Sequence, residues 1–269
     1  MKKILAMLLA AVMCVSLVGC GGGSTEAGEV TAKIEVKNRV ETPEEADFVI
    51  ATDKGFSPFE FQDSKDNIIG IDMDIFEAIA QDQDFTYCLQ YIGWDAAIAA
   101  CQAGQADGMI AGASITDERK ANGWIFSDGY YDATQGMAVA KDSSVKGFAD
   151  LNGKKVAVKN GTMSNEYAES IKAQYGFEVV TFATSPDMYQ AVMGGQVDAC
   201  LDDTPILKYN IKTGQLDMQF VEGTENNPAQ YGMAIFDAAN QELIEKFNAG
   251  LANIKANGTY DEIIANYLG

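Results

Sequence analysis

A run of small residues, hydroxyls and one arginine, Ala111 to Arg119, has the composition of a ligand-binding loop. It follows the apolar run 108–110, which predicts a short buried parallel strand. In α/β sheets, ligands bind beyond the carboxyl ends of such strands. Small residues leave backbone N–H groups accessible, and the Arg119 guanidinium offers a planar fork that matches a carboxylate. The alternative is an ordinary loop with a surface arginine.

A second copy of this pattern supports the first interpretation. The segment 103–110 is echoed by the segment 194–201, and each copy follows a predicted helix and precedes a polar loop. The repeat predicts two similar α/β lobes. In register, Ala111-Gly112 of the first lobe corresponds to Asp202-Asp203 of the second, so each lobe offers a loop to a ligand and only the second loop is acidic.

Further chemistry-bearing residues are expected at strand ends of both lobes. An arginine, bare backbone donors and a helix N-terminus suit a carboxylate, an isolated aspartate suits an ammonium, and aromatic rings suit the chain between them. This combination describes a free α-amino acid. The candidate residues are Asp53, Phe56, Trp94, Gly112, Ser114, Arg119, Lys159, Thr162, Asp202 and Asp203.

The elements that position these residues predict one lobe inserted into another. We expect lobe 1 to span 47–128 and 232–269, lobe 2 to span 134–226, and a hinge of two crossings at 129–133 and 227–231. Two crossings permit the lobes to close around a ligand. We also expect Asp95 to cap the helix that ends at Gln102, and Thr259 to form a capping box with Glu262.

The N-terminus has the layout of a precursor. Two lysines precede an apolar run too short for a membrane span, which predicts a signal peptide over 1–19. Leu17-Val18-Gly19-Cys20 resembles a bacterial lipoprotein signal, which implies cleavage before Cys20 and its acylation as a membrane anchor. A plain secretory signal with an incidental cysteine is the alternative. The polar segment 20–46 is expected to be a flexible tether.

Composition limits the other possibilities. The formal net charge is -20, which repels nucleic acid and anionic lipid headgroups. The sequence has no histidine, which removes the Ser/His and Cys/His dyads and most zinc sites, and we expect no cofactor and no metal. We expect the three cysteines that follow Cys20 in the sequence to be small buried apolar residues. A disulfide bridge between Cys88 and Cys101 is a second possibility.

Several ordered motifs resemble the polar amino-acid-binding proteins of the ABC-transporter solute-binding family (family 3). They are Phe59-Glu60-Phe61, Gly70-Ile71-Asp72-Met73-Asp74, Ser114 to Arg119, Phe126 to Tyr131, and Asn257-Gly258-Thr259-Tyr260. Ala51-Thr52-Asp53, Val156 to Lys159 and Asp203-Thr204-Pro205 are similar to glutamine-binding proteins in particular. The resemblance implies the type II periplasmic-binding-protein fold and an extracytoplasmic monomer that delivers a free L-amino acid to a membrane permease.

The same resemblance implies roles for individual residues. Arg119 would clamp the α-carboxylate together with N–H groups near Ser114 and Thr162-Met163, and Asp203 would take the α-ammonium. The Gly112 carbonyl would also accept from the ammonium. Phe56 and Trp94 would sandwich the side chain of the ligand, and Asp53 and Lys159 would bind its tip.

Two departures from the glutamine binders leave the ligand open. Asp202 stands where they have a histidine and Met163 where a glycine is expected, so an extra carboxylate near the tip raises the alternative of arginine or lysine. Structural alternatives also remain: Phe56 and Trp94 as core aromatics, Lys159 as an exposed strand-end charge, and Asp202 as a solvent-facing acid. Rival classes are a dehydratase on the same scaffold with Asp202 as general acid, a sensor module, and a purely structural lipoprotein.

Overall fold

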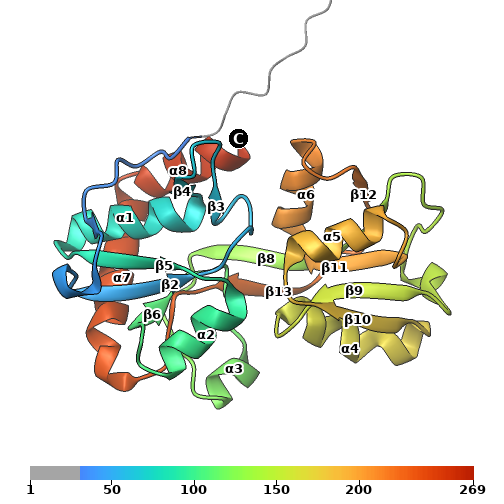
Figure 1. Ribbon diagram of the computed structural model, residues 1–269, viewed down its shortest axis with the longest axis horizontal. Coiled ribbons are helices and arrows are strands. Elements are labelled where there is room, and N and C mark those ends of the chain that lie inside the picture. Colours follow the sequence, from blue (N-terminus) through green and yellow to red (C-terminus); the bar gives the residue numbers. More distant parts are fainter. Residues whose placement is uncertain (1–30) are drawn as a thin grey trace, which may run out of the picture.

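The computed structural model describes residues 31–269 as two α/β lobes side by side, each built around its own sheet (Figure 1). The chain crosses twice between the lobes. The signal peptide and Cys20 lie outside the described residues.

Lobe 1 has a six-stranded sheet in the order β1-β5-β2-β6-β14-β7. The first four strands run parallel, whereas β14 is antiparallel to both β6 and β7. The strands are β1 (Arg39–Val40), β2 (Phe48–Thr52), β5 (Tyr87–Tyr91), β6 (Gly108–Met109), β7 (Ile125–Phe126) and β14 (Ala234–Ile235), with a separate hairpin of β3 (Phe61–Gln62) and β4 (Ile68–Ile69).

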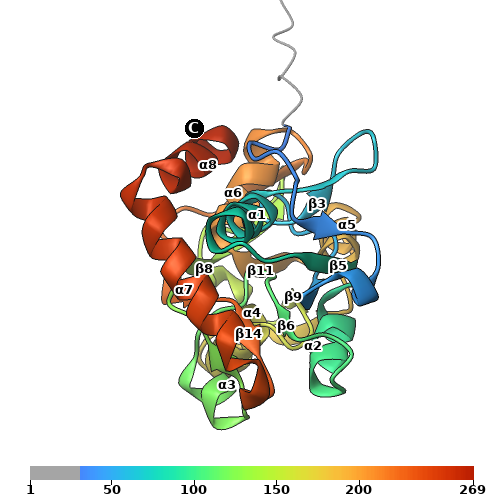
Figure 2. The same cartoon turned by 90° about the vertical axis from the view of Figure 1, so that its left-hand side faces the viewer.

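The helices of lobe 1 cover both faces of this sheet. In Figure 1, α1 and α8 lie on one side and α2 and α3 on the other, and Figure 2 shows α7 running along the side of the lobe. Their bounds are α1 (Ile71–Gln83), α2 (Trp94–Gln102), α3 (Asp117–Ala121), α7 (Gln241–Ala256) and α8 (Thr259–Leu268), with 3₁₀ turns at Pro43–Glu45 and Ala238–Asn240.

Lobe 2 has a sheet in the order β10-β9-β11-β8-β12, with β13 also paired to β8. Parallel β9, β10 and β11 follow the pattern expected of an α/β unit, and β8 is antiparallel to its neighbours. The elements are β8 (Tyr131–Ala140), β9 (Lys155–Lys159), α4 (Met163–Tyr175), β10 (Glu178–Phe182), α5 (Ser185–Met193), β11 (Ala199–Asp203), α6 (Thr204–Lys212), β12 (Met218–Phe220) and β13 (Asn226–Tyr231), with a 3₁₀ turn at Phe148–Leu151.

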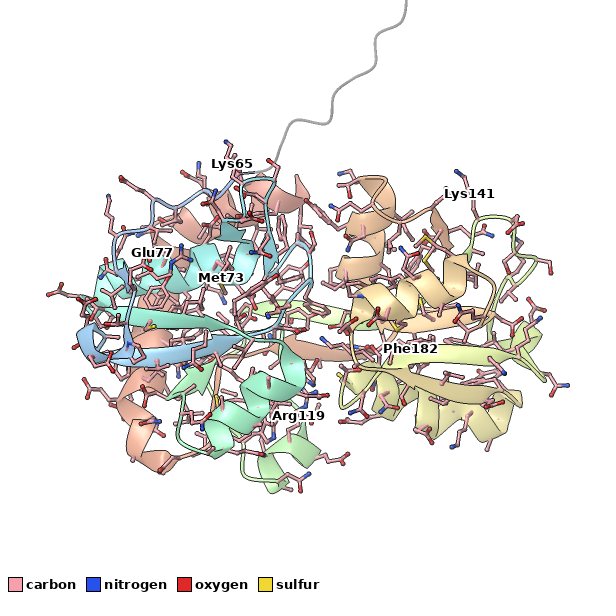
Figure 3. The ribbon with its side chains drawn as sticks, in the orientation of Figure 1. Lys65, Met73, Glu77, Arg119, Lys141 and Phe182 are labelled. Carbon is pink, nitrogen blue, oxygen red and sulfur yellow. The ribbon has the colours of Figure 1, made fainter. Side chains whose placement is uncertain are left out.

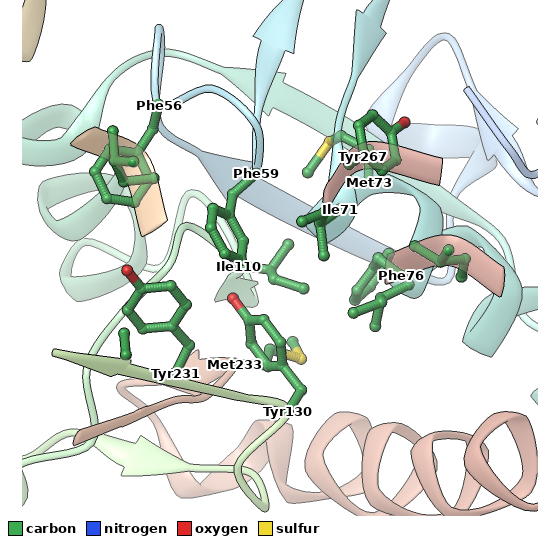
Figure 4. Close-up of a cluster of buried hydrophobic side chains, with 14 of the residues drawn as sticks. Phe56, Phe59, Ile71, Met73, Phe76, Ile110, Tyr130, Tyr231, Met233 and Tyr267 are labelled. Atoms are coloured by element: carbon green, nitrogen blue, oxygen red, sulfur yellow. The ribbon is translucent and has the colours of Figure 1, made fainter. Parts of the chain in front are cut away.

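The two crossings are paired strands rather than loops. Tyr131 of β8 lies opposite Tyr231 of β13, and the end of β13 is tied to lobe 1 because Gly232 N donates to the Ala113 carbonyl at 2.9 Å. Phe59 packs edge-on against both tyrosine rings, at 4.9 and 5.1 Å between ring centroids. Figure 4 shows Phe59 to the right of Phe56 and above Tyr231, so the core of lobe 1 continues to the hinge.

The expectation of a tether over 20–46 is wrong for its described part. Residues 31–46 belong to lobe 1: Arg39–Val40 forms β1 against β5, and two buried carboxylates of α1 accept backbone N–H groups from this segment. Asp74 accepts from Lys33 at 2.7 Å, and Glu77 accepts from Lys37 and Asn38 at 2.8 and 2.9 Å. None of the side chains of residues 31–46 is buried, so the segment shows no apolar periodicity. Its backbone is held instead by carboxylates that are distant in sequence.

Two of the expected helix caps are also corrected. Helix α2 begins at Trp94 after Gly93 rather than being capped by Asp95, because Asp53 Oδ1 accepts the Trp94 N–H at 2.8 Å. Helix α8 starts after Gly258, whose φ is 88°, and the first N–H of the helix, that of Thr259, donates to Asn257 Oδ1 at 3.0 Å, so Thr259 and Glu262 form no capping box.

The three described cysteines, Cys88, Cys101 and Cys200, are buried free thiols, which excludes the bridge between Cys88 and Cys101. Within residues 31–269, no helix is long and apolar enough to cross a membrane.

Candidate functional site

The structure brings the candidate residues from both lobes to one cavity. All ten strand-end candidates and Met163 line it, together with Ala111, which sequence reasoning did not select although it adjoins Gly112. The space left for a water-sized molecule is about 20 Å³, room for roughly one water, and the two lobes contact each other directly around it. A larger molecule therefore fits in this cavity only if the lobes part.

Arg119 occupies the lobe 1 wall of this cavity. It lies on α3, whose start is fixed by Thr116, because the Thr116 hydroxyl accepts the Arg119 backbone N–H at 3.1 Å. The side chain is 5% exposed and donates to the Ser114 carbonyl at 2.9 Å and, across the cleft, to the Gly161 carbonyl at 3.4 Å. Figure 3 labels Arg119 near α2 and α3, on the part of lobe 1 that faces lobe 2.

No carboxylate of the described residues 31–269 lies within ion-pair distance of this arginine. Among residues 31–269, the ion pairs include none that involves Arg119. Burial lowers the pKa of Arg119, while the charges of Glu166 and Asp203 oppose that change. A buried guanidinium with unused N–H donors is costly unless an anion reaches it.

Asp203 lies at the carboxyl end of β11 on the lobe 2 wall. Its carboxylate accepts a hydrogen bond from the hydroxyl of Tyr231, which lies in the expected hinge crossing 227–231 but was not among the candidate site residues, because nothing in the pattern of β13 marks it. Burial, followed by the neighbouring charge of Asp202, raises the pKa of Asp203 to about 7. An ammonium group at this position would supply the positive charge that the pair of acids lacks.

Asp202 is buried, so the solvent-facing alternative is wrong. Its Oδ2 accepts the Tyr189 hydroxyl at 2.5 Å and the Ser185 hydroxyl at 3.4 Å, both from α5, and its Oδ1 accepts the Asp203 N–H at 2.8 Å. Burial raises its pKa, and the Tyr189 hydrogen bond opposes the increase. The carboxylate is thus held by α5 and positions the backbone of Asp203.

Lys159 and Asp53 form an ion pair across the cavity, and both side chains are 5% exposed. Lys159 ends β9 of lobe 2, so the exposed strand-end alternative is wrong, and Asp53 follows β2 of lobe 1. Asp53 Oδ1 also accepts the N–H groups of Lys54 and Trp94, at 2.7 and 2.8 Å, which fixes its orientation. The pair presents an N–H donor and a carboxylate acceptor side by side.

Phe56 and Trp94 flank this ion pair. The Lys159 ammonium lies 5.8 Å from the ring centroids of both, and each aromatic residue is 6% exposed. The Trp94 indole N–H donates to the Gly161 carbonyl at 3.2 Å, directly before α4. Both rings belong to apolar clusters and also line the cavity, so they are core aromatics, and their binding role stays a prediction.

Gly112, which lines the cavity, is held by a buried acid. Gly112 has φ +54°, and its N–H donates to Asp72 Oδ2 at 2.8 Å. A Cβ on Gly112 would lie 2.6 Å from Phe56 Cε1, so only glycine fits against this ring. Burial raises the pKa of Asp72 to about 6, and burial followed by the charge of Asp72 raises the pKa of Glu60 well above its usual value.

The N-terminus of α4 completes the lobe 2 wall. Thr162 is its N-cap, and its hydroxyl accepts the Asn165 N–H at 3.3 Å. The positive end of the helix dipole and the first free N–H groups, including that of Met163, therefore lie at the cavity. They lie on the opposite side of the cleft from Arg119, whose NH2 group reaches the Gly161 carbonyl beside them.

Two lobes joined by paired hinge strands, with a polar cavity between the carboxyl ends of their sheets, define a type II periplasmic-binding-protein architecture. Residues 48–269 match the family model "Bacterial extracellular solute-binding proteins, family 3". The chain belongs to this family, which places it outside the cytoplasm.

Named relatives and solved structures agree with this assignment. The arginine-binding extracellular protein ArtP of Bacillus subtilis is 27% identical over 98% of this chain and 96% of its own. The second substrate-binding domain of Lactococcus lactis GlnP, in an open conformation, is 40% identical over 90% of this chain and 98% of its own, with a TM-score of 0.58. An ancestral arginine-binding protein, solved with arginine and with glutamine, is 32% identical over 87% of this chain and 100% of its own, with a TM-score of 0.75.

Proposed function

We propose that this protein captures a free L-amino acid between its lobes by hinge closure and delivers it to an ABC importer. The observation that carries the proposal is the buried, unpaired Arg119 on one wall, with the acidic Asp203 on the other. An α-carboxylate would satisfy the first and an α-ammonium the second. The proposed ligand therefore bridges the two lobes and stabilises their closed arrangement, because most of its contacts exist only there.

We propose L-glutamine as the preferred ligand. A side-chain amide has a carbonyl that accepts from Lys159 and an NH₂ group that donates to Asp53, which matches the observed pair. A cationic side chain would instead meet the Lys159 ammonium at close range. Asp202 does not compensate, since its oxygens already accept hydrogen bonds from Tyr189, Ser185 and Asp203.

A basic amino acid is the second candidate, because buried acids outnumber buried cations around the cavity. Asp53, Glu60, Asp72, Asp202 and Asp203 are all at most 6% exposed, against Arg119 and Lys159. Such an excess favours a cationic ligand. Relatives named for arginine, and the ancestral protein solved with either amino acid, support keeping this candidate.

A thermal-shift screen with all twenty amino acids tests both candidates. A ligand at a hundredfold excess over Kd stabilises the folded state by about 2.7 kcal/mol, which corresponds to an increase in Tm of roughly 5–10 °C for a chain of this size. Arg119→Ala should abolish the shift. The matched control is Lys120→Ala, which removes an exposed charge from the same helix and leaves the cavity intact.

The outcomes separate the candidates. A response to glutamine alone supports the first, and a response to arginine or lysine alone supports the second. No response to any amino acid, or a response that persists in Arg119→Ala, would contradict the amino-acid proposal.

We further propose that the protein is a monomeric binding protein rather than an enzyme. Asp202, the candidate general acid, is engaged in hydrogen bonds with Tyr189 of α5 and with the Asp203 N–H.

We also propose that acylated Cys20 anchors the protein to the membrane after removal of residues 1–19. The motif that supports this is Leu17-Val18-Gly19-Cys20, followed by a glycine-rich stretch. Segment 31–40 is fixed on α1 of lobe 1, so an anchor at Cys20 would attach to lobe 1 and leave lobe 2 free to move.

A further inference from the structure

The two tryptophans of the sequence both contact the same cation. Trp94 begins α2, and Trp124 lies between α3 and β7. The Arg119 guanidinium carbon is 5.2 Å from the Trp94 ring centroid and 5.0 Å from that of Trp124. The two rings are neighbours, 6.1 Å apart between centroids, so the guanidinium rests against both.

Trp124 is held firmly in lobe 1. Its ring stacks on Phe126 at 5.6 Å and packs against Phe236 at 4.5 Å between centroids, and the residue is 9% exposed. All its ring contacts lie within lobe 1, unlike those of Trp94, which donates to the Gly161 carbonyl of lobe 2. Gly161 belongs to lobe 2, so opening the lobes would move its carbonyl away from Arg119 and Trp94, whereas Trp124 and Arg119 both belong to lobe 1 and would stay in contact.

The chemistry explains why tryptophan suits this position. A carboxylate beside Arg119 would neutralise its charge but would occupy the N–H fork. An aromatic face stabilises the cation from the side and takes none of its donors. The described residues give Arg119 two carbonyl acceptors, two indole faces and no counter-ion.

We propose that Trp124 is a positioning residue for carboxylate recognition. It takes the place of a counter-ion, keeping Arg119 buried, oriented and free to bind the carboxylate of the ligand in both the open and the closed arrangement. This inference rests on the proposed function, in which Arg119 binds the carboxylate of the ligand.

Calorimetric titration of the full chain with L-glutamine and L-arginine tests the inference, using whichever binds. Trp124→Leu keeps apolar bulk but removes the aromatic face, and we expect on the order of tenfold weaker binding. Trp124→Phe restores an aromatic face and should bind within about threefold of wild type. The matched control is Phe236→Leu, which disturbs the same cluster without touching Arg119 and should leave the affinity unchanged.

Fluorescence measures ligand binding independently of calorimetry, and near-wild-type binding in Trp124→Phe but not in Trp124→Leu is the result that a role in apolar packing alone would not give. In Trp124→Phe, Trp94 is the remaining tryptophan, so a ligand that reaches Arg119 should still change the emission. Wild-type affinity in Trp124→Leu, or equal weakening in Phe236→Leu, would overturn the inference.

A failure of the proposed function is distinguishable from a failure of this inference. If wild type binds neither amino acid, urea unfolding of Arg119→Met, Trp124→Leu and the double variant still measures the contact. If Arg119→Met is less destabilising, or more stabilising, in the Trp124→Leu background than in wild type, beyond measurement error, Trp124 stabilises Arg119; additive effects, or a difference of the opposite sign, refute this.

Discussion

Replacing Lys159 with methionine removes one half of an ion pair that joins the lobes. Both side chains are 5% exposed, so Asp53 would remain buried without its partner in the closed arrangement. Removing one partner of a buried pair costs about 3–5 kcal/mol, which converts to a loss of roughly two to four orders of magnitude in affinity. The cost falls on closure, because opening the lobes separates Asp53 from Lys159 and exposes both to water.

Calorimetry and urea unfolding distinguish this cost from general destabilisation. We expect Lys159→Met to bind L-glutamine at least a hundredfold more weakly, and its unfolding free energy without ligand to change by less than about 1 kcal/mol. Binding of L-arginine should improve, because the ammonium that repels a cationic side chain is gone. The control is Lys155→Met, at the exposed start of the same strand.

Two results would refute this reasoning. The first is wild-type affinity for glutamine in Lys159→Met, which would place the side chain of the ligand elsewhere. The second is an equal loss of affinity in Lys155→Met, which would assign the effect to net charge.

Three further predictions follow from the site. Asp203 must be ionised to bind an ammonium, and its pKa is about 7, so affinity should fall about tenfold from pH 8 to pH 6 and binding at pH 6 should release a proton; titrations in two buffers of different ionisation enthalpy would show this, and a flat profile would contradict it. Gly112→Ala places a Cβ against Phe56 at positive φ, so it should lower the unfolding free energy by about 1–3 kcal/mol and weaken ligand binding, whereas unchanged urea unfolding would be inconsistent with this geometry. Cys20→Ala should move the protein from the membrane fraction to the medium, and continued membrane retention would exclude the lipid anchor.

The architecture can be predicted from the sequence because hydrophobic periodicity indicates the strands and helices, and the internal repeat indicates two similar lobes. Apolar runs such as 108–110 become buried strands, and the repeat places Gly112 and Asp203 on facing walls of one cavity. The candidate residues converge there because strand ends point to the same edge of each sheet.

Contacts between distant segments could not be predicted from local patterns. Residues 31–46 look like a tether because their order comes from Asp74 and Glu77 on α1. From the sequence, Asp202 is an extra carboxylate near the ligand. Its hydrogen-bond partners Tyr189 and Ser185 could not be predicted, because they reach it only through the packing of α5 beside β11. Trp124 carried no signal at all, since its importance comes from its distance to Arg119.

The central claim is that a free amino acid joins Arg119 of lobe 1 to Asp203 of lobe 2. A crystal structure grown with L-glutamine tests it most directly. We expect the α-carboxylate to bind Arg119, the α-ammonium to bind Asp203 and the side-chain amide to lie between Lys159 and Asp53. A ligand bound in the reverse direction, or one that leaves Arg119 without an anion, would contradict it.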